Sequence, residues 1–504
     1  VHCYRRDVVT GHAEELIDAG YALEIADAPL VQRGLTLADL AHVLDLQSAG
    51  VIPQQPAGQL LGLLLDTLDI PAEEFPYDPS HGEVYNSRER YFAAGIGDAA
   101  GWLHAGRPRR EAMRIAFRLH LRDVLADFVG AAADLATQLA QLAGRHTETW
   151  MADQTYLQHA QPTTFGHYAV SFAYPVLRDG RRLLDGLTWV DASPGGAGGV
   201  NGTALLTDRG HVAELLGFGS VIEHTRDAMW QTDGLVDALA ASASLLVTQG
   251  KLAEDLEIWA SHEFSYVTIA DGYSRSSVLM PQKRNPYALT MIRGASGVAI
   301  GRLSGLLALT KTPSARSDNL IFAYGEVPRA LAAAVRTTRL SAGVVRTLRV
   351  HGERLWSVLE GGFTQAADLA EHLMLTYRLD YRSAYRIVGH AVRTAADHGL
   401  RGVDIDAAAL DAAALAVLGR SLGIDGGGVD GGALSRVLDP REVVRTRTAR
   451  GGAAPAEVAR MVATCTDEAG DLSRQARMRQ EHFRHAEQAL IAAARHAATP
   501  GTGQ

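Results

Sequence analysis

Long stretches without proline constrain this chain more than any other feature of its sequence. No proline occurs from Arg109 to Gln161, from Gly195 to Met280 or from Tyr287 to Thr312. Proline breaks helices because it lacks an amide hydrogen and clashes with the preceding turn. Within the first stretch, the segment from Glu111 to Arg145 is rich in Ala, Leu and Arg, which are good helix formers. These stretches therefore predict long, uninterrupted helices.

The second stretch also carries an apolar seam at helical spacing. Its large apolar residues recur largely at steps of three, four and seven, namely Leu235, Leu239, Leu245, Leu246, Leu252, Leu256 and Trp259. Clear alternating strand patterns are hard to find, so the sequence predicts an all-α protein built around long central helices. Helices of this length cannot cover their apolar faces alone, and we expect a bundle shared between subunits.

Breaks in this pattern divide the chain into three expected domains. A central long-helix bundle domain, residues 105–356, lies between an N-terminal helical domain, residues 1–104, and a C-terminal helical domain, residues 357–504. The two outer regions have shorter elements and more turn residues. The mostly glycine run from Gly423 to Gly432 indicates a flexible loop. Pro175 lies in an otherwise helical stretch and should kink or end the helix.

Composition excludes several classes of protein. The 504 residues are 47% apolar and 21% charged, and the net charge of −9 is spread along the chain, which argues against nucleic-acid binding. Two cysteines cannot form a disulfide framework, no Cys/His spacing suits zinc, and a reducing cytoplasm is the simplest location. The charged first fifteen residues contain no signal-peptide core. The longest apolar run, Gly294 to Leu309, is interrupted by Arg302 and too short to predict a membrane helix.

The segment from Tyr273 to Pro286 carries the most chemistry. It brings several hydroxyls, a lysine and an amide close together before an expected helix start. Removing a proton next to a carboxylate builds a second negative charge, so catalysis needs a base at the carbon and preorganised donors at the carboxylate. Ser277, Lys283 and Asn285 could supply both, provided that neighbouring groups activate the serine. The alternative is an ordinary polar loop that caps the next helix.

Ser277–Val–Leu–Met–Pro–Gln–Lys–Arg–Asn–Pro286 resembles the signature of the fumarase/aspartase superfamily, G-S-S-x-M-P-x-K-x-N. The wider sequence looks most like argininosuccinate lyase. The further matching segments keep the family's order and cover nearly the whole chain, and they are Gly101 to Arg109, Leu157 to Pro162, Gly202 to Ala204 with Asp208 and Arg209, Leu252 to Leu256, Phe264 to Val267 and Arg441 to Gly452.

The resemblance implies a three-domain, mostly helical subunit and a homotetramer around a twenty-helix core, with active sites built from three subunits. It implies cleavage of a C–N or C–O bond on a small anionic succinyl compound, release of fumarate, and no metal or organic cofactor. Aligned on the signature, Ser277 is the catalytic base, and Lys283 and Asn285 are carboxylate-binding residues. Ser277 rather than Ser276 is the base because it lies six residues before Lys283.

The chain departs from the family at its charge relay. The family's T-H-x-Q motif reads Thr155–Tyr156 followed by Leu157–Gln158, and Thr290 stands where a helix usually supplies the glutamate partner. Losing both members together is easier to explain than losing one, because an unpaired buried carboxylate is costly. Tyr156 or the nearby His159, which replaces an arginine, could donate a proton instead.

The substrate-binding segments depart as well. The usual G-R-S-R-N-D reads Gly106 to Glu111, with Arg109 kept and Arg110 in place of asparagine. The upstream H-T-A-N segment reads Tyr85 to Arg88. Three residues, Arg316, Ile321 and Tyr324, stand where the family grips the arginine end of its substrate. Argininosuccinate is therefore not the expected substrate.

The resemblance and its departures define a set of candidate substrate contacts. Besides Asn285, these are Arg109, Arg110, Thr155, His159, Gln161, Thr203 and Arg316. The arginines, together with Arg88, suit an extra anionic group on the ligand, whereas surface salt bridges are the simpler explanation for Arg88 and Arg110. The glycine-rich run from Gly195 to Gly202 lacks the strand and βαβ context of a dinucleotide site, and its backbone is expected near substrate.

The sequence is compatible with four functions. The first is β-elimination of an N-linked group from a succinyl compound other than argininosuccinate. The second is a nitrosuccinate-type lyase, because nitrite leaves as a stable anion without a proton donor. The third is true argininosuccinate cleavage with Tyr156 as the donor. The last is a scaffold that has lost its chemistry and serves in binding or structure.

Overall fold

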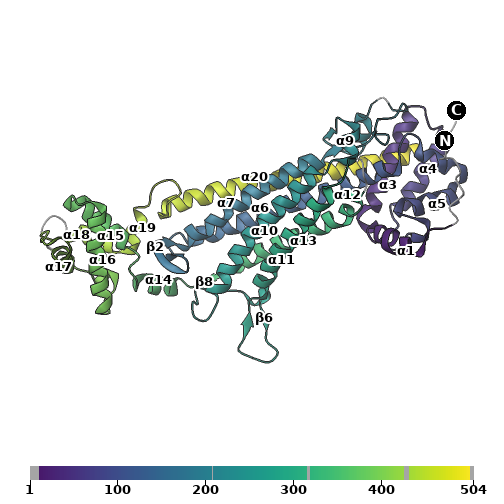
Figure 1. Ribbon diagram of the computed structural model, residues 1–504. Coiled ribbons are helices and arrows are strands. Elements are labelled where there is room, and N and C mark those ends of the chain that lie inside the picture. The colour runs from purple at the N-terminus through teal and green to yellow at the C-terminus, as the bar shows by residue number, and fades with distance from the viewer. Residues whose placement is uncertain (1–10, 207, 315–317, 425–430, 500–504) are drawn as a thin grey trace.

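The computed structural model describes residues 11–206, 208–314, 318–424 and 431–499. It is an elongated, mostly helical molecule, as expected (Figure 1). Five long helices run side by side through its centre and contact one another: α6 (Arg109–Arg145), α7 (Phe165–Val190), α10 (Asp233–Trp259), α11 (Tyr287–Thr310) and α13 (Ala323–Thr347).

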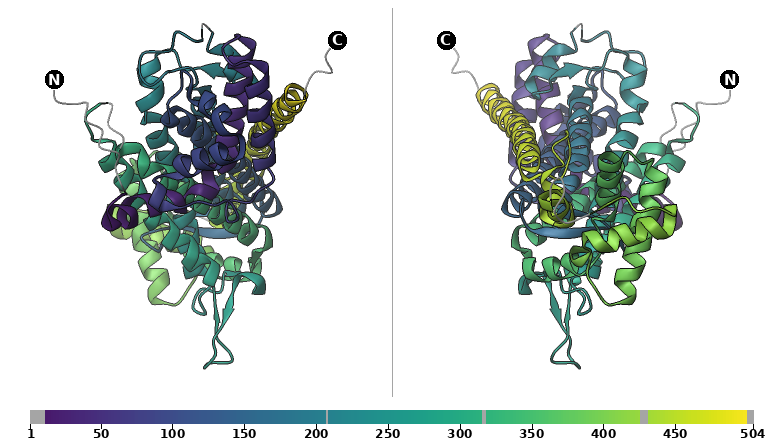
Figure 2. Two further views of the ribbon diagram at one scale, coloured as in Figure 1. Left: turned by 90° about the vertical axis from the view of Figure 1, so that its right-hand side faces the viewer. Right: turned by 90° about the vertical axis from the view of Figure 1, so that its left-hand side faces the viewer.

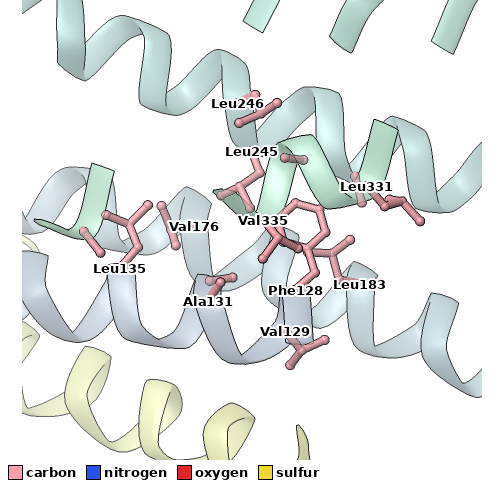
Figure 3. Packing of buried hydrophobic residues seen from close by; sticks show 14 of the residues in the cluster. Phe128, Val129, Ala131, Leu135, Val176, Leu183, Leu245, Leu246, Leu331 and Val335 are labelled. Carbon is pink, nitrogen blue, oxygen red and sulfur yellow. The ribbon is translucent and has the colours of Figure 1, made fainter. Parts of the chain in front are cut away.

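Apolar side chains from these helices form one continuous core. Phe128 of α6, Leu183 of α7 and Val335 of α13 lie together in it (Figure 3). Leu245 and Leu246, from the seam that the sequence predicts, are buried there as well. Burying a side chain of this size contributes about 1.5–3 kcal/mol, so the aligned faces hold the bundle together.

Helix α7 does not end at Pro175. The helix starts where Thr164 Oγ1 accepts a hydrogen bond from His167 N at 3.0 Å, and it continues to Val190. On both sides of the proline, Ala173 and Val176 are buried in the core. Packing against α6 therefore keeps the helix going through a residue that breaks isolated helices.

Short helices gather at one end of the bundle (Figure 1). They are α1 (Glu14–Leu16), the π-helical turn η1 (Ile17–Tyr21), α2 (Ala22–Ala26), α3 (Ala28–Ser48), α4 (Gln54–Thr67), the 3₁₀ turn η2 (Pro79–His81), α5 (Val84–Ile96) and the 3₁₀ segment η3 (Gly97–His104). The small helices α8 (Gly210–Leu215), α9 (Thr225–Trp230) and α12 (Asp318–Ile321) connect the long ones.

The opposite end carries a separate small core formed by α15 to α18. The elements at this end of the molecule are α14 (Gly352–Glu360), α15 (Ala366–Tyr377), α16 (Tyr381–Asp397), the 3₁₀ turn η5 (Gly402–Asp404), α17 (Ala407–Leu418), α18 (Gly431–Leu438) and α19 (Pro440–Arg445). Most of the predicted glycine-rich loop, residues 425–430, lies outside the described residues.

The last helix, α20 (Pro455–Ala498), is 44 residues long and returns along the whole bundle (Figures 1 and 2). Val458, Met461 and Cys465 belong to the central core, whereas the small core of α15 to α18 is separate. The range 357–504, predicted as a single C-terminal domain of shorter elements, therefore contains two parts that pack in different places, and one of them is the longest described helix.

Strand pairs occur only as short additions among the described residues. They are β1 (Trp150–Thr155) with β2 (Gln158–Thr164), β3 (Ala192–Ser193) with β4 (Ser220–Val221), β5 (Val267–Thr268) with β8 (Arg349–Val350), and β6 (Arg275–Ser276) with β7 (Arg284–Asn285). The sequence gives no sign of the β1–β2 hairpin because most residues near its turn are polar and exposed, which leaves no alternation of apolar side chains.

Candidate active site

The signature segment forms a hairpin loop that projects from the bundle (Figures 1 and 2). Ser277 follows β6, and its backbone N–H donates to the Lys283 carbonyl at 3.2 Å. Across the two strands, Asn285 Nδ2 donates to the Arg275 carbonyl at 3.2 Å. These bonds place the serine, the lysine and the amide on one compact loop, just before α11 begins.

The loop directs two backbone donors at the Ser277 hydroxyl. Its Oγ accepts hydrogen bonds from Leu279 N at 3.2 Å and from Met280 N at 3.0 Å. Donors aimed at an oxygen stabilise its negatively charged form, as they do in an oxyanion hole. Both donors lie two and three residues further along the chain, so they form a local turn around the hydroxyl.

The tip of this loop is apolar and uncovered within one chain. Val278 is fully exposed and Leu279 is 82% exposed. Lys283 is exposed as well, while Ser277 and Asn285 are half-buried. A projecting apolar tip is typical of a surface that another molecule covers.

The β1–β2 hairpin carries four further candidates and turns in a strained conformation. Its turn residues Tyr156 and Leu157 have φ of 56° and 58°, in the left-handed region that residues with a side chain rarely adopt. Tyr156 is 98% exposed, and Thr155, His159 and Gln161 are exposed on the adjoining strands. Such strain costs about 1–3 kcal/mol per residue and is typical of functional sites.

Arg109 and Arg110 begin α6, and Thr203 lies beside Gly106, just before this helix. Arg109 Nε contacts Glu83 Oε1 at 3.0 Å, and its guanidinium also donates to Asn86 Oδ1 at 3.0 Å. Thr203 Oγ1 lies directly against Gly106, where an added Cβ would be 2.8 Å away. We name this end of α6 with these three candidate residues the arginine corner.

The glycine-rich run wraps the carboxylate of Glu111, which is not among the predicted site residues. Glu111 accepts hydrogen bonds from Gly196 N and Gly198 N, both at 2.7 Å, and both glycines have positive φ. Burial raises the pKa of Glu111, while Arg107 and the two amides lower it. The backbone of this run was expected near substrate. The amides of Gly196 and Gly198 instead donate to Glu111, so these two are not free to bind a ligand. Thr203 lies beside them in the arginine corner. The sequence feature that could have indicated Glu111 is its position directly after Arg109 and Arg110.

Arg88 neither faces substrate nor forms a surface salt bridge. Its side chain is completely buried and contacts Asp39 Oδ2 at 2.8 Å, and Arg107 contacts the same carboxylate. The sequence predicted either a substrate contact or a surface salt bridge for Arg88. Both predictions are wrong, because its ion pair is buried in the interior. Arg316 lies outside the described residues, and Thr290 is exposed on α11.

One chain does not bring the three groups of candidates together. The arginine corner lies at one end of α6 and the β1–β2 hairpin at the other, and a helix of 37 residues is about 55 Å long. The signature loop projects from the side of the bundle (Figure 1). Among the described residues, no cluster of three or more His, Cys, Asp or Glu side chains could hold a metal ion.

Comparison with known proteins gives consistent matches over this architecture. Residues 44–301 match the lyase family, and residues 363–445 match the argininosuccinate lyase C-terminal family. Argininosuccinate lyase of Methanoculleus marisnigri is 33% identical over 86% of both chains. The corresponding protein of Methanothermobacter thermautotrophicus is 32% identical over 83% of this chain and 88% of its own.

Solved structures agree on the fold. The crystal structure of EDDS lyase in complex with formate has a TM-score of 0.85 and 25% identity, covering 96% of this chain and 94% of the other. A fumarate lyase from Mesorhizobium has a TM-score of 0.70 at 21% identity, covering 86% and 95% of the two chains, which supports the fold alone. The chain therefore belongs to the fumarase/aspartase superfamily, is argininosuccinate lyase-like, and is a carbon–nitrogen lyase.

Proposed function

We propose that the enzyme eliminates an N-linked group from a substituted succinate other than argininosuccinate and releases fumarate, with Ser277 as the base. The observation that carries this proposal is the pair of backbone amides aimed at Ser277 Oγ. Lys283 and Asn285 follow on the same loop, where they can neutralise the carboxylate that gains charge as the proton leaves.

The departures from the family support a different substrate. Tyr156 stands where the relay histidine is expected, and Thr290 lies on the exposed side of α11 without a carboxylate. Arg110 adds positive charge to the arginine corner, which favours a ligand with additional negative charge over one with a guanidinium end. The similar solved structure is an enzyme called EDDS lyase, not argininosuccinate lyase. This fold is therefore not tied to argininosuccinate as substrate.

We propose that the active unit is a homotetramer in which the separated groups meet. Helix α11 is the one described helix that is long and apolar enough to cross a membrane. Only 11% of its apolar stretch is buried within one chain, so most of this apolar helix is left uncovered. It contacts α10 and α13, and a groove of about 470 Å³ beside it is lined largely by apolar side chains, including Met291, Val298 and Leu340. An apolar helix packed on two others and exposed on its outer face is suited to pairing with other subunits.

Replacing Val298 with aspartate is expected to break the tetramer. Val298 is 55% exposed on α11 and lines the groove, so a carboxylate there would lose its water in each subunit contact, at about several kcal/mol per copy. Light scattering after size-exclusion chromatography would show smaller species. The matched control is Leu375→Asp on α15, where the leucine is 66% exposed and far from α11, and this variant should keep the parent mass. An unchanged mass for Val298→Asp would contradict the interface.

A substrate panel tests the reaction itself. Purified enzyme is incubated with argininosuccinate, several N-substituted aspartates and nitrosuccinate, and fumarate is followed by its ultraviolet absorbance. We expect fumarate from an N-substituted succinate and none from argininosuccinate. Efficient cleavage of argininosuccinate would contradict the substrate proposal, and no fumarate from any compound would favour a scaffold without chemistry.

A further inference from the structure

One side chain holds the glycine-rich run against the first turn of α6. Glu111 follows Arg110 directly on that turn, and each oxygen of its carboxylate accepts a hydrogen bond, from Gly196 N and from Gly198 N, both at 2.7 Å. Glu111 is 2% exposed, so losing either bond leaves a buried polar group without a partner. The two bonds therefore tie the run to the helix that carries both arginines of the arginine corner.

A second side chain holds the same run. Arg209, which precedes α8, donates from Nε to the Gly195 carbonyl at 2.8 Å and from Nη1 to the Ile222 carbonyl at 2.7 Å. Its stem fills the space next to Gly196, where an added Cβ would lie 2.6 Å from Arg209 Cγ. The run is thus held at Gly195, Gly196 and Gly198, and it cannot shift as a whole without breaking several contacts.

These contacts continue along the chain to Thr203. Gly202 N donates to the Ala197 carbonyl at 2.8 Å, and Ala197 lies between the two glycines whose amides Glu111 accepts. An added Cβ on Gly198 would lie 2.4 Å from the Gly202 carbonyl oxygen, so the two ends of the run are in direct contact. Because Thr203 follows Gly202 in the chain, its position depends on the two bonds to Glu111.

We propose that Glu111 is a positioning residue for substrate binding, which fixes the separation between Thr203 and the two arginines at the start of α6. A ligand that contacts a hydroxyl and a guanidinium together needs them at a set separation, because hydrogen bonds weaken steeply away from their preferred distance and angle. The inference rests on the proposed function, in which Thr203 and the arginines are substrate contacts. It adds a residue that acts through them without touching the ligand.

Glu111→Gln tests this role because glutamine keeps the shape of glutamate but offers one carbonyl oxygen to two amides. Its NH2 group then faces the second backbone N–H, and one of the two bonds is lost. On the best compound of the substrate panel we expect KM to rise roughly 10-fold and kcat to change little, since the base is untouched. Glu214→Gln, the same change at an exposed position on α8, should keep the parent KM.

A double-mutant cycle separates positioning from a general loss of stability. Thr203→Ala should by itself raise KM roughly 10-fold, because it removes the hydroxyl contact. If Glu111 acts through Thr203, the variant with both changes should have a KM about 10-fold above that of the parent, whereas independent effects would multiply to about 100-fold. Multiplied effects, or an unchanged KM in Thr203→Ala, would overturn the inference.

Two further measurements keep the test decisive. Glu111→Asp retains both carboxylate oxygens on a side chain one methylene shorter, and it enters the same cycle if the glutamine variant does not fold. Fumarate binding, measured by isothermal titration calorimetry, gives the comparison without turnover. Weaker fumarate binding in Glu111→Gln, with no fumarate released from any compound, would overturn the proposed function and support this inference. Unchanged KM and fumarate binding beside a lowered thermal midpoint would mean that Glu111 only stabilises the fold, which would overturn it.

Discussion

Replacing Ser277 with alanine is expected to reduce fumarate release by about 10²–10⁴-fold, because the substitution removes the proposed base, which is also the acceptor of the Leu279 and Met280 amides. The backbone bond from Ser277 N to the Lys283 carbonyl does not involve the side chain and should persist. The change should therefore lower kcat far more than it raises KM, since Lys283 and Asn285, the proposed carboxylate-binding residues, are unchanged. Steady-state kinetics on the best compound of the substrate panel would measure both constants.

Ser276→Ala is the matched control for this loss. Ser276 is the adjacent hydroxyl on β6, its side chain is exposed, and its strand partner is Arg284. It stands where the family signature has glycine, so a side-chain hydroxyl there has no expected role. Near-normal turnover of Ser276→Ala beside an inactive Ser277→Ala would assign the base, whereas equal losses would mean that the loop rather than one oxygen had been disturbed.

The central helices and the signature loop could be predicted because their information is local. The spacing of Leu245 and Leu246 on α10 follows from one helix face meeting a core, and both are buried. The path of α20 depends on which distant surface accepts it, and nothing in its own residues specifies that partner. The β1–β2 hairpin escaped prediction because exposed polar strands lack an apolar alternation.

The site was harder to predict than the fold because its residues act across long separations. Arg88 reads as a surface arginine until Asp39, 49 positions away, is seen against it in the interior. Glu111 and Gly196 are 85 positions apart, yet the Gly196 amide donates a hydrogen bond to the Glu111 carboxylate at 2.7 Å. Sequence spacing gives the chemistry of one segment, whereas contacts between segments decide which charges are paired and which remain for substrate.

Replacing Asp39 with alanine is expected to lower the free energy of unfolding by about 3–5 kcal/mol, the cost of leaving buried charges without their partner. Asp39 and Arg88 are both 0% exposed, and Arg107 is 3% exposed. The carboxylate accepts hydrogen bonds from Arg88, from Arg107 and from Tyr85 Oη at 3.1 Å. Alanine would therefore leave the buried guanidinium groups of both Arg88 and Arg107 without their carboxylate partner. The apparent midpoint of thermal or urea unfolding, at matched protein concentration, would measure the effect.

The other acceptors that the two guanidinium groups contact are neutral: Thr36 Oγ1 for Arg88, and the Ala38 carbonyl and Tyr85 Oη for Arg107. Within the described part of the chain, the Nε atoms of Arg88 and Arg107 are buried without a hydrogen-bond partner even in the parent protein. An exposed pair offers the control, because Asp127 is 40% and Arg339 57% exposed, and Asp127→Ala should cost at most about 1 kcal/mol. Similar losses for the two variants would contradict the buried-charge argument.

Asp39→Ala should also disturb the arginine corner, since Arg107 lies two residues before Arg109. Substrate binding should then weaken, which a rise in KM would reveal.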